Sequence, residues 1–255
     1  YHGPRSQMMR CIDHPTMLKD GSGWGAMAGV SAVILAREGF TGAPALTVEQ
    51  GDHWVDLGER WLILEQYFKP YPICRWAQAP VEAALVLRSK YDIAPEAIEA
   101  IRVTSFHEAT RLATITPQTT EEAQYSTVYP VAVALAKGAV SATDVSGEAL
   151  RDPVVARLAA RLSMNEDAYA NERFPEQRPA RVSITFDGRT VTSDWIEPRW
   201  DATCPPSDAE LEAKFHGLAD PAIGAARAKR IKAAVAGIEA DGLGALHDEL
   251  VMPIR

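Results

Sequence analysis

The segment RVSITFDGRTVTSDW, residues 181–195, decides the fold class of this chain. Residues 181–186 and 190–195 are rich in β-branched residues and flank Asp187-Gly188. This dipeptide is typical of two-residue hairpin turns, because both central residues of such a turn take a positive φ. The segment predicts an antiparallel hairpin, and since the two ends of the chain have helical patterns, we expect an α+β fold.

The middle of the chain alternates strand and helix patterns. Large apolar and aromatic residues at 61–68 predict a strand, and residues 101–106 predict a second one. Residues 81–88 and 121–136 have helical patterns, the latter followed by the stop signal Lys137-Gly138. Three prolines are expected to end the first strand and to separate it from the first helix: Pro70, Pro72 and Pro80.

Both ends of the chain are expected to be helical. At residues 24–37 apolar side chains recur at helical spacing, with Ser22 as the N-cap and Gly39 as the stop signal. Small residues in this stretch, such as Gly29, allow a neighbour to approach closely, so we expect one buried helix. Alanine-rich patterns at the other end predict helices over residues 208–216, 221–240 and 243–250.

The order of these elements predicts the domain organisation. The two helical ends are expected to pack together as one domain, with the sheet-containing middle inserted as a lid. This assigns residues 1–58 to the helical domain, residues 59–203 to an α+β lid domain, and residues 204–255 to C-terminal helices that return to the helical domain.

The composition excludes several classes of partner. The 255 residues include 34 acidic and 26 basic side chains, and the net charge of -8 argues against a general affinity for nucleic acid or anionic membranes. No apolar stretch in the sequence is long enough to cross a bilayer. Cys11, Cys74 and Cys204 are too widely spaced for a CxxC metal site and odd in number, which favours a reducing, cytoplasmic compartment.

Lys19 precedes a glycine-rich helix start formed by Gly21, Ser22 and Gly23. Unpaired backbone N–H groups and the positive end of the helix dipole favour an anion there, so this segment is a candidate carboxylate site. The alternative is a surface lysine that precedes an ordinary capped helix.

A second cationic segment, FKPYPICRW at residues 68–76, places Lys69 and Arg75 in an aromatic turn that prolines stiffen. Such a turn holds charged groups that have little entropy to lose on binding. The alternative is a turn whose cations point into water. Cys74 is discounted as a nucleophile, because no histidine lies near it in sequence and buried cysteines usually serve packing.

Tyr125 and Tyr129 are four residues apart on one predicted helix, so both can face the same neighbour. A tyrosine close to cations can act as a general acid, although core aromatic residues with a solvated hydroxyl are the alternative. The histidines lack metal-ligand spacing, so no metal site is expected. The chain also lacks the motifs of P-loop, dinucleotide-binding and α/β-hydrolase enzymes.

Four segments of the chain follow the order of one known family's signatures: PTMLKDGSGWGAMAGV at 15–30, AREGFTG at 36–42, YFKPYPICRWA at 67–77 and EEAQYSTVYPVAVA at 121–134. Together they resemble the MmgE/PrpD family, which includes 2-methylcitrate dehydratases, cis-aconitate decarboxylases and iminodisuccinate epimerases. The resemblance implies a helical domain with a smaller α+β lid and an active site in the cleft between them. It also implies activity without a metal or organic cofactor, and a homodimer or other oligomer.

The resemblance further implies roles for particular residues. Lys19 and Lys69 resemble the family's two active-site lysines. Tyr129 lies where lyase members carry an active-site tyrosine that the epimerase branch lacks, which favours a lyase. The candidates for binding the substrate are Gly21, Ser22, Gly23 and Arg75.

The chain resembles only the second half of a family member. The family's helical N-terminal region carries the aspartate and histidines expected to act as acid or base, and it has no counterpart in these residues. Either that region is removed or a separate polypeptide supplies it. Gln78 stands where many relatives have histidine, a difference that bears on the substrate.

Together these features favour a lyase, a dehydratase or hydratase, that acts on a small hydroxy-polycarboxylate such as a 2-methylcitrate-like acid. The reaction would begin with loss of a proton alpha to a carboxylate, and fixed cations would lower the barrier because the carbanion gathers negative charge. Three alternatives stay open: a dicarboxylate epimerase, a cis-aconitate-type decarboxylase, and a non-catalytic subunit of a split enzyme.

Overall fold

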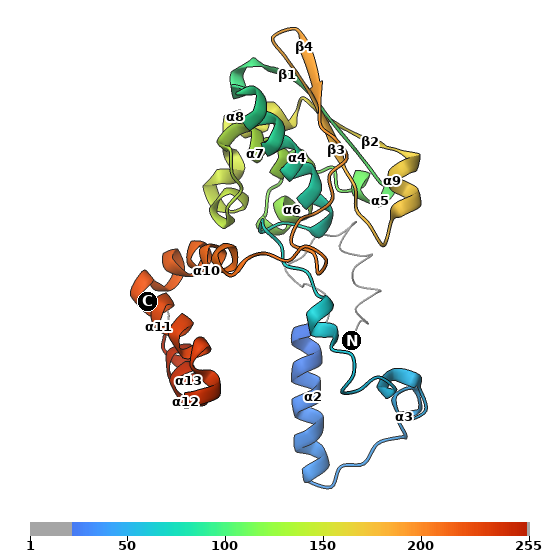
Figure 1. Cartoon of the computed structure of the whole chain (residues 1–255), viewed down its shortest axis with the longest axis vertical. Coiled ribbons are helices and arrows are strands. Elements are labelled where there is room, and N and C mark those ends of the chain that lie inside the picture. Colours follow the sequence, from blue (N-terminus) through green and yellow to red (C-terminus); the bar gives the residue numbers. More distant parts are fainter. Residues whose placement is uncertain (1–21, 254–255) are drawn as a thin grey trace. The chain divides into compact units, whose positions relative to one another are not determined.

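The computed structural model describes residues 22–253 of the chain (Figure 1). Contacts divide the chain into two compact units, Tyr1–Ala202 and Thr203–Arg255. The first unit contains a mixed sheet with helices packed on it, and the second contains helices alone among its described residues. This is the α+β fold that the sequence predicts.

The sheet of the first unit has four strands in the order β2-β1-β3-β4. Their bounds are β1 Ile98–Ser105, β2 Leu162–Glu166, β3 Arg181–Phe186 and β4 Arg189–Thr192. Strands β1 and β2 are parallel, whereas β1 with β3 and β3 with β4 are antiparallel. The predicted strand at 101–106 is confirmed as β1, which begins at Ile98.

The predicted hairpin is confirmed as β3 and β4. Asp187 and Gly188 form the turn with φ angles of 48° and 71°, the pair of positive values that a type I′ turn requires. Along β3, buried Val182, Ile184 and Phe186 alternate with less buried residues. The hairpin thus has one face in the core and one face toward solvent.

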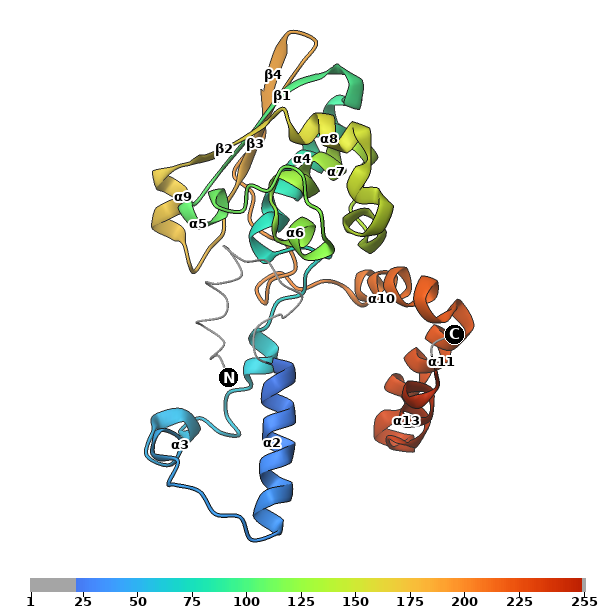
Figure 2. The same ribbon diagram turned by 180° about the vertical axis from the view of Figure 1, so that it is seen from behind.

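Three helices cover one face of this sheet, as Figures 1 and 2 show from opposite sides. They are α4 Arg75–Tyr91, α7 Val128–Lys137 and α8 Pro153–Ala159. The main core lies between these helices and the strands. Its large, fully buried members include Ile98, Ile101, Leu135, Leu158, Ile184, Val81 and Val131.

Short helices connect the elements of the first unit. Helices α5 and α9 follow the carboxyl ends of β1 and β2 and lie close together (Figure 1). The bounds are α5 His107–Thr110, α6 Thr120–Tyr125, α9 Ala168–Arg173, η3 Pro95–Ala97, η4 Ala142–Val145 and η5 Gly147–Arg151, where η marks a 3-10 helix.

The predicted single helix at 121–136 is wrong, because the structure divides it into α6 and α7 at Ser126-Thr127. Pro130 explains the break, because it has no N–H to donate to the Ser126 carbonyl four residues earlier and its ring clashes with that carbonyl in a continuous helix. In the first turn of α7 the same proline is well tolerated. Tyr125 and Tyr129 therefore belong to different helices, whereas the predicted stop at Gly138 is confirmed by its φ of 77°.

The predicted strand at 61–68 is also wrong. Residues Leu62–Glu65 form the 3-10 helix η2, and the remainder is irregular. No described strand pairs with this segment, and an isolated extended segment is not stable in water. The apolar residues of this segment are exposed instead.

Pro80 does not precede the helix that was predicted at 81–88 but lies inside α4, which begins at Arg75. The proline removes one backbone hydrogen bond of the helix. Burial of Trp76, Ala77 and Val81 in the core outweighs this loss, so tertiary packing extends the helix past a local breaker.

Before η2 the chain forms α2 Ser22–Arg37, α3 Leu46–Glu49 and η1 Asp52–Trp54. The helix predicted at residues 24–37 is confirmed as α2, although Ser22 is its first residue rather than its N-cap. The predicted stop at Gly39 is confirmed as a Schellman motif: the Phe40 N–H donates to the Leu35 carbonyl at 3.0 Å, and the Gly39 N–H donates to the Ala36 carbonyl at 3.1 Å.

The predicted burial of α2 is wrong for the part of the chain that the structure describes. Val30 is 63% exposed and Ile34 is 54% exposed. The apolar pattern is sufficient to form the helix, but burial also needs a second surface, and no described segment covers these side chains.

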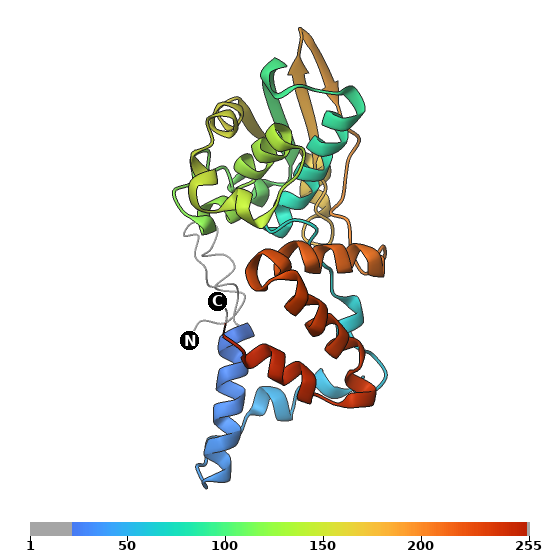
Figure 3. The ribbon, with the colours of Figure 1, turned by 90° about the vertical axis from the view of Figure 1, so that its left-hand side faces the viewer.

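The second unit consists of α10 Asp208–Ile223, α11 Ala225–Ala236, α12 Ile238–Asp241 and α13 Gly244–Val251 (Figure 3, orange to red). The side chains of Ser207 and Glu210 form a capping box at the start of α10. The predicted break before Pro221 is wrong, because α10 continues through it to Gly224, whose φ is 82°. Arg230 and Glu249 form an ion pair that joins α11 to α13.

Among residues 22–253, no helix combines the length and apolar character that a membrane span requires.

The turn geometry predicts the effect of two substitutions in the hairpin. Gly188→Ala should lower the free energy of unfolding by about 1 kcal/mol, because a Cβ is disfavoured at positive φ while the space around it is open. Asp187→Asn is the matched control and should be neutral, since asparagine also tolerates the left-handed region. Urea unfolding measures both, and equal midpoints for Gly188→Ala and the parent chain would contradict the assignment.

Candidate functional site

The candidate site is the turn at residues 68–74, which leads into α4, and its backbone is held by the side chain of Gln78. This side chain is only 1% exposed. Its Oε1 accepts a hydrogen bond from the Tyr71 N–H at 3.1 Å, and its Nε2 lies 3.0 Å from the Tyr71 carbonyl and 3.1 Å from the Ile73 carbonyl. The Cys74 carbonyl is also in reach, at 3.4 Å. One buried amide therefore organises the whole turn.

Lys69 lies at the beginning of this turn and is exposed. Its Nζ donates to the Ile73 carbonyl at 3.4 Å, so the side chain folds back over the turn that carries it. The ammonium group is thus held near the N-terminus of α4 while it can still meet a ligand from solvent. The positive end of the helix favours an anion in the same region.

Arg75, the first residue of α4, is 5% exposed and binds two other chain segments. Its Nη2 lies 2.5 Å from Oδ2 of Asp201, and its Nη1 lies 3.5 Å from the Phe68 carbonyl and 3.4 Å from the Arg199 carbonyl. The guanidinium also stacks on the Tyr67 ring, 3.9 Å from its centroid. These contacts tie the turn to the segment that follows the hairpin.

Burial lowers the pKa of the Arg75 guanidinium, while the Asp201 carboxylate opposes the shift. An arginine remains protonated at any ordinary pH, so its charge must be compensated inside the protein. The Nε of Arg75 is buried and makes no hydrogen bond to the described residues. The hydrogen bonds described for the Arg75 guanidinium therefore go to Asp201 and to the Phe68 and Arg199 carbonyls.

A second link joins the turn to α4 and to the same distant segment. The Tyr71 hydroxyl donates to Oε2 of Glu82 at 2.5 Å, and Nε of Arg199 lies 3.1 Å from this oxygen. Burial, followed by the bond to Glu82, raises the pKa of the Tyr71 phenol, which stays protonated at neutral pH. Both ends of the turn are consequently anchored to residues 199–201.

The surroundings of Arg75 are rich in cations. The Arg178 N–H donates to Oε2 of Glu197 at 2.8 Å. Burial raises the pKa of the Glu197 carboxyl, and the charges of Arg178, Arg75 and Arg173 oppose this shift. Arg75 therefore interacts with two carboxylates, those of Asp201 and Glu197.

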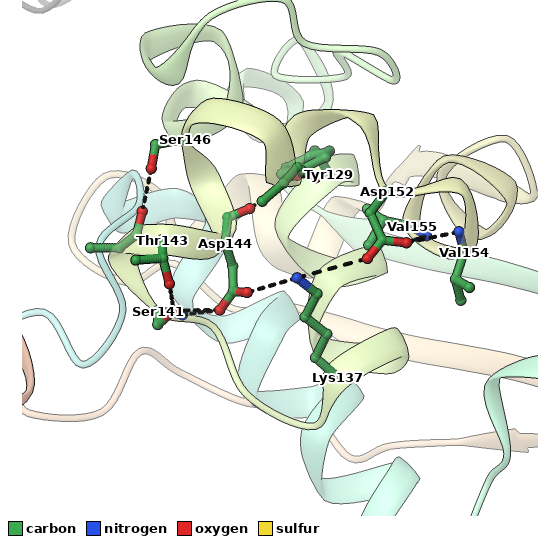
Figure 4. Close-up of polar contacts among 11 residues, drawn as sticks. Tyr129, Lys137, Ser141, Thr143, Asp144, Ser146, Asp152, Val154 and Val155 are labelled. Atoms are coloured by element: carbon green, nitrogen blue, oxygen red, sulfur yellow. Dashed lines mark hydrogen bonds and ion pairs between the residues drawn. The ribbon is translucent and has the colours of Figure 1, made fainter.

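Tyr129 is in a different environment, which Figure 4 shows. The residue is 2% exposed, and its hydroxyl lies 3.0 Å from the Asp144 carbonyl and 2.9 Å from the Ala149 carbonyl. Burial, followed by the Asp152 and Asp144 carboxylates, raises its pKa to about 12. The phenol therefore keeps its proton and joins α7 to the segment at 142–151.

The segment that Tyr129 contacts is itself held by charges at the end of α7. Nζ of Lys137 lies 2.8 Å from Oδ1 of Asp144 and 3.8 Å from Oδ2 of Asp152 (Figure 4). The Asp144 carboxylate also accepts hydrogen bonds from the Ser141 N–H and hydroxyl, and Lys137 and Ser141 hold its pKa below the usual value. This cluster stabilises the connection between α7 and α8.

Of the residues predicted from the sequence, the structure brings Lys69 and Arg75 together on one anchored turn. The described partners of the Tyr129 hydroxyl are instead two backbone carbonyls. Lys19 and Gly21 lie outside the described residues. Ser22 and Gly23 begin α2, and nothing is described of their side chains.

Sequence reasoning missed the residues that organise the turn. Gln78 was noted only for its difference from relatives, and Asp201 was not noted at all. The signal for Gln78 was a polar residue among the apolar residues of a helix that starts earlier than predicted. For Asp201 there was no signal, because its partner is 126 positions away in the sequence.

Comparison with known proteins identifies the family. A sequence model of the MmgE/PrpD C-terminal domain matches residues 71–240 of this chain. The chain belongs to the MmgE/PrpD family. Arg75, Gln78 and Tyr129 lie within the matched region, and Lys69 lies immediately before it. No curated protein shows a significant match.

The MmgE/PrpD family includes hydro-lyases such as 2-methylcitrate dehydratase. In the part of the chain that the structure describes, no group of three or more His, Cys, Asp or Glu side chains is placed to hold a metal ion.

The pair of buried Arg75 with Asp201, which is 47% exposed, predicts different effects of two acid-to-amide changes. Asp201→Asn should lower the free energy of unfolding by about 1–3 kcal/mol, because it removes the charged partner of the buried Arg75 guanidinium. Glu148→Gln is the matched control: Glu148 pairs with Arg151 but is 89% exposed, so the change should stay within about 0.5 kcal/mol. Thermal or urea unfolding compares them, and equal losses would refute the role of Asp201.

The environment of Tyr129 predicts that Tyr129→Phe lowers the free energy of unfolding by about 1–3 kcal/mol, because a buried donor is lost from two carbonyls. Tyr169→Phe is the control, since Tyr169 is exposed and stacks on Trp195 without a hydrogen bond from its hydroxyl among the described residues. Chemical unfolding of both variants measures the difference. Unchanged stability of Tyr129→Phe would mean that its two hydrogen bonds contribute nothing.

Proposed function

We propose that this chain forms part of a hydro-lyase, a dehydratase or hydratase, that acts on a small hydroxy-polycarboxylate such as a 2-methylcitrate-like acid. Membership of the MmgE/PrpD family supports this class of reaction. The observation that carries the proposal is the anchored turn, which presents the exposed Lys69 ammonium beside the N-terminus of α4.

The reaction begins with removal of a proton alpha to a carboxylate, and negative charge then spreads onto the carboxylate oxygens. A cation that is already in position lowers the barrier, because its attraction grows as this charge develops. Lys69 serves this purpose on the turn, and Lys19 is proposed as the second cation. A turn fixed by Gln78 and Arg75 loses little entropy when the ligand binds.

Arg75 was proposed from the sequence as a residue that binds the substrate. Its bonds to Asp201 and to two carbonyls support an indirect role, in which it holds the turn in place. Direct binding by Arg75 would require a substrate carboxylate to replace Asp201.

Tyr129 is proposed as the acid that protonates the departing hydroxyl group. Its high pKa keeps the proton available at neutral pH, but the hydroxyl must first leave the Asp144 and Ala149 carbonyls. The Tyr129→Phe variant also tests this role: a loss of turnover much larger than the loss of stability supports it, and unchanged turnover removes it.

The general base is proposed to come from the family's N-terminal half, which completes the cleft either as a separate polypeptide or as another part of the same protein. The exposed apolar side chains of α2, including Met27, Val30 and Ile34, support a further contact of this kind. The complete enzyme is proposed to be an oligomer in the cytoplasm that needs no metal or organic cofactor.

Two other enzymatic outcomes use a stabilised carbanion as well. A dicarboxylate epimerase would form it by removing the alpha proton, and would exchange this proton with deuterium from heavy water without forming a double bond. A cis-aconitate-type decarboxylase would instead form it by releasing carbon dioxide, and the carbanion would then take up a proton. A non-catalytic subunit would bind the polycarboxylate and turn over nothing, even beside its partner polypeptide.

Lys69→Ala in the complete assembly should lower kcat/KM for the polycarboxylate by about 10²–10³-fold, as expected when one fixed donor is lost from a developing anion. Lys90→Ala is the control, because Lys90 is an exposed lysine near the end of α4 and should leave turnover unchanged. Formation of the unsaturated product is followed by its ultraviolet absorbance. Near-normal turnover of Lys69→Ala would defeat the proposed role of the turn.

A further inference from the structure

We propose that Gln78 is the positioning residue of the candidate site, and that it fixes the Lys69 ammonium through a shared backbone carbonyl. Its catalytic consequence rests on the proposed function, but its structural part does not. Gln78 is buried within α4, and its amide binds the turn at 71–74 on both its donor and its acceptor side.

The turn depends on this side chain because its own backbone offers few hydrogen bonds. Pro70 and Pro72 have no N–H, so they cannot donate within the turn. The Ile73 N–H donates to the Tyr71 carbonyl at 2.9 Å, and the Cys74 N–H donates to the Gln124 carbonyl at 2.8 Å. The Tyr71 N–H then finds its acceptor in Gln78.

The Ile73 carbonyl links the buried amide to the exposed cation. It accepts from Nε2 of Gln78 at 3.1 Å and from Nζ of Lys69 at 3.4 Å. A carbonyl has two lone pairs and can accept both bonds at once. Because the position of this oxygen is fixed from inside by Gln78, the direction in which Lys69 presents its charge is fixed as well.

Glutamine meets both requirements of this position, an acceptor for the Tyr71 N–H and a donor for the Tyr71 and Ile73 carbonyls. A methionine of similar length would fill the space, but it would leave the Tyr71 N–H without its acceptor and would remove one donor each from the Tyr71 and Ile73 carbonyls, so the turn would relax. A glutamate would keep the acceptor for the Tyr71 N–H, but its second oxygen would lie against the Tyr71, Ile73 and Cys74 carbonyl oxygens and could not donate to them as Nε2 does. Both substitutions therefore loosen the turn that holds the ammonium.

The experiment measures the reactivity of Lys69 toward a neutral acetylating reagent in the full chain, by peptide mass spectrometry, relative to Lys90. In Gln78→Met the relaxed turn releases the ammonium, and we expect acetylation of Lys69 to rise about threefold or more. In Gln78→Glu the turn loses the donor that holds the Ile73 carbonyl, and we expect acetylation of Lys69 to rise there as well. The control is Gln66→Met, a change at an exposed glutamine just before the turn, which should alter neither rate.

A rise at Lys69 in both variants supports the positioning role when acetylation of Lys137 is unchanged, because general loosening of the fold would also release Lys137 from Asp144 and Asp152. Unchanged reactivity of Lys69 in the folded variants overturns the role, and so does an equal rise at Lys137. Circular dichroism establishes folding, and if Gln78→Met does not fold, the result for Gln78→Glu decides alone.

Turnover in the complete assembly separates this inference from the proposed function. Gln78→Met should lower kcat about tenfold or more with little change in KM, because a displaced catalytic group costs rate rather than binding. If Lys69 reactivity shifts as expected while Lys69→Ala retains turnover, the positioning role stands and the proposed function fails. If Lys69 reactivity is unchanged in the Gln78 variants while Lys69→Ala loses turnover, the proposed function stands and the positioning role fails.

Discussion

A buried guanidinium group is the constraint on which the site depends. A charge with the low exposure of Arg75 is costly unless it is paired and hydrogen-bonded. Its partners come from the turn before α4 and from the segment after the hairpin, so these parts of the chain must meet at the first residue of α4. Because α4 also packs on the sheet, the position of the turn relative to the sheet is set by this one requirement.

The turn separates two kinds of polar group. Gln78, Arg75 and Tyr71 are buried, and their bonds are used to hold backbone and neighbouring side chains in place. Lys69 is exposed, and among its contacts its Nζ donates to the Ile73 carbonyl of the turn. A buried network of this kind fixes the backbone from which an exposed cation extends, and a cation that is already in position stabilises a developing anion.

The parts of the fold that were predictable are those that local chemistry determines. Asp187-Gly188 specifies its hairpin through positive φ, and Gly39 and Gly138 end their helices for the same reason. The prediction of a strand at 61–68 is wrong because a strand needs a partner strand, which the local sequence does not reveal. The prediction that Pro80 precedes the helix is wrong for a different reason: burial of α4 in the core stabilises a helix that contains the proline.

The same distinction applies to the candidate site. The cationic turn was predictable, since proline, aromatic and basic residues stand together at 68–76. Its anchoring was not, because the Arg75 bond to Asp201 spans the hairpin and the Gln78 contacts depend on where α4 begins. Tyr129 shows the converse: its position in the sequence suggested chemistry, whereas its hydroxyl binds two carbonyls in the core.

Helix α2 extends this reasoning to what lies beyond the described residues. Its end is encoded locally by the Schellman motif at Gly39, yet its apolar side chains remain exposed. Apolar patterning that forms a helix without burying it is stable in a protein only when another surface supplies the contact. The N-terminal half that is proposed to carry the general base would supply such a surface, so assembly of the catalytic cleft and burial of α2 would be one event.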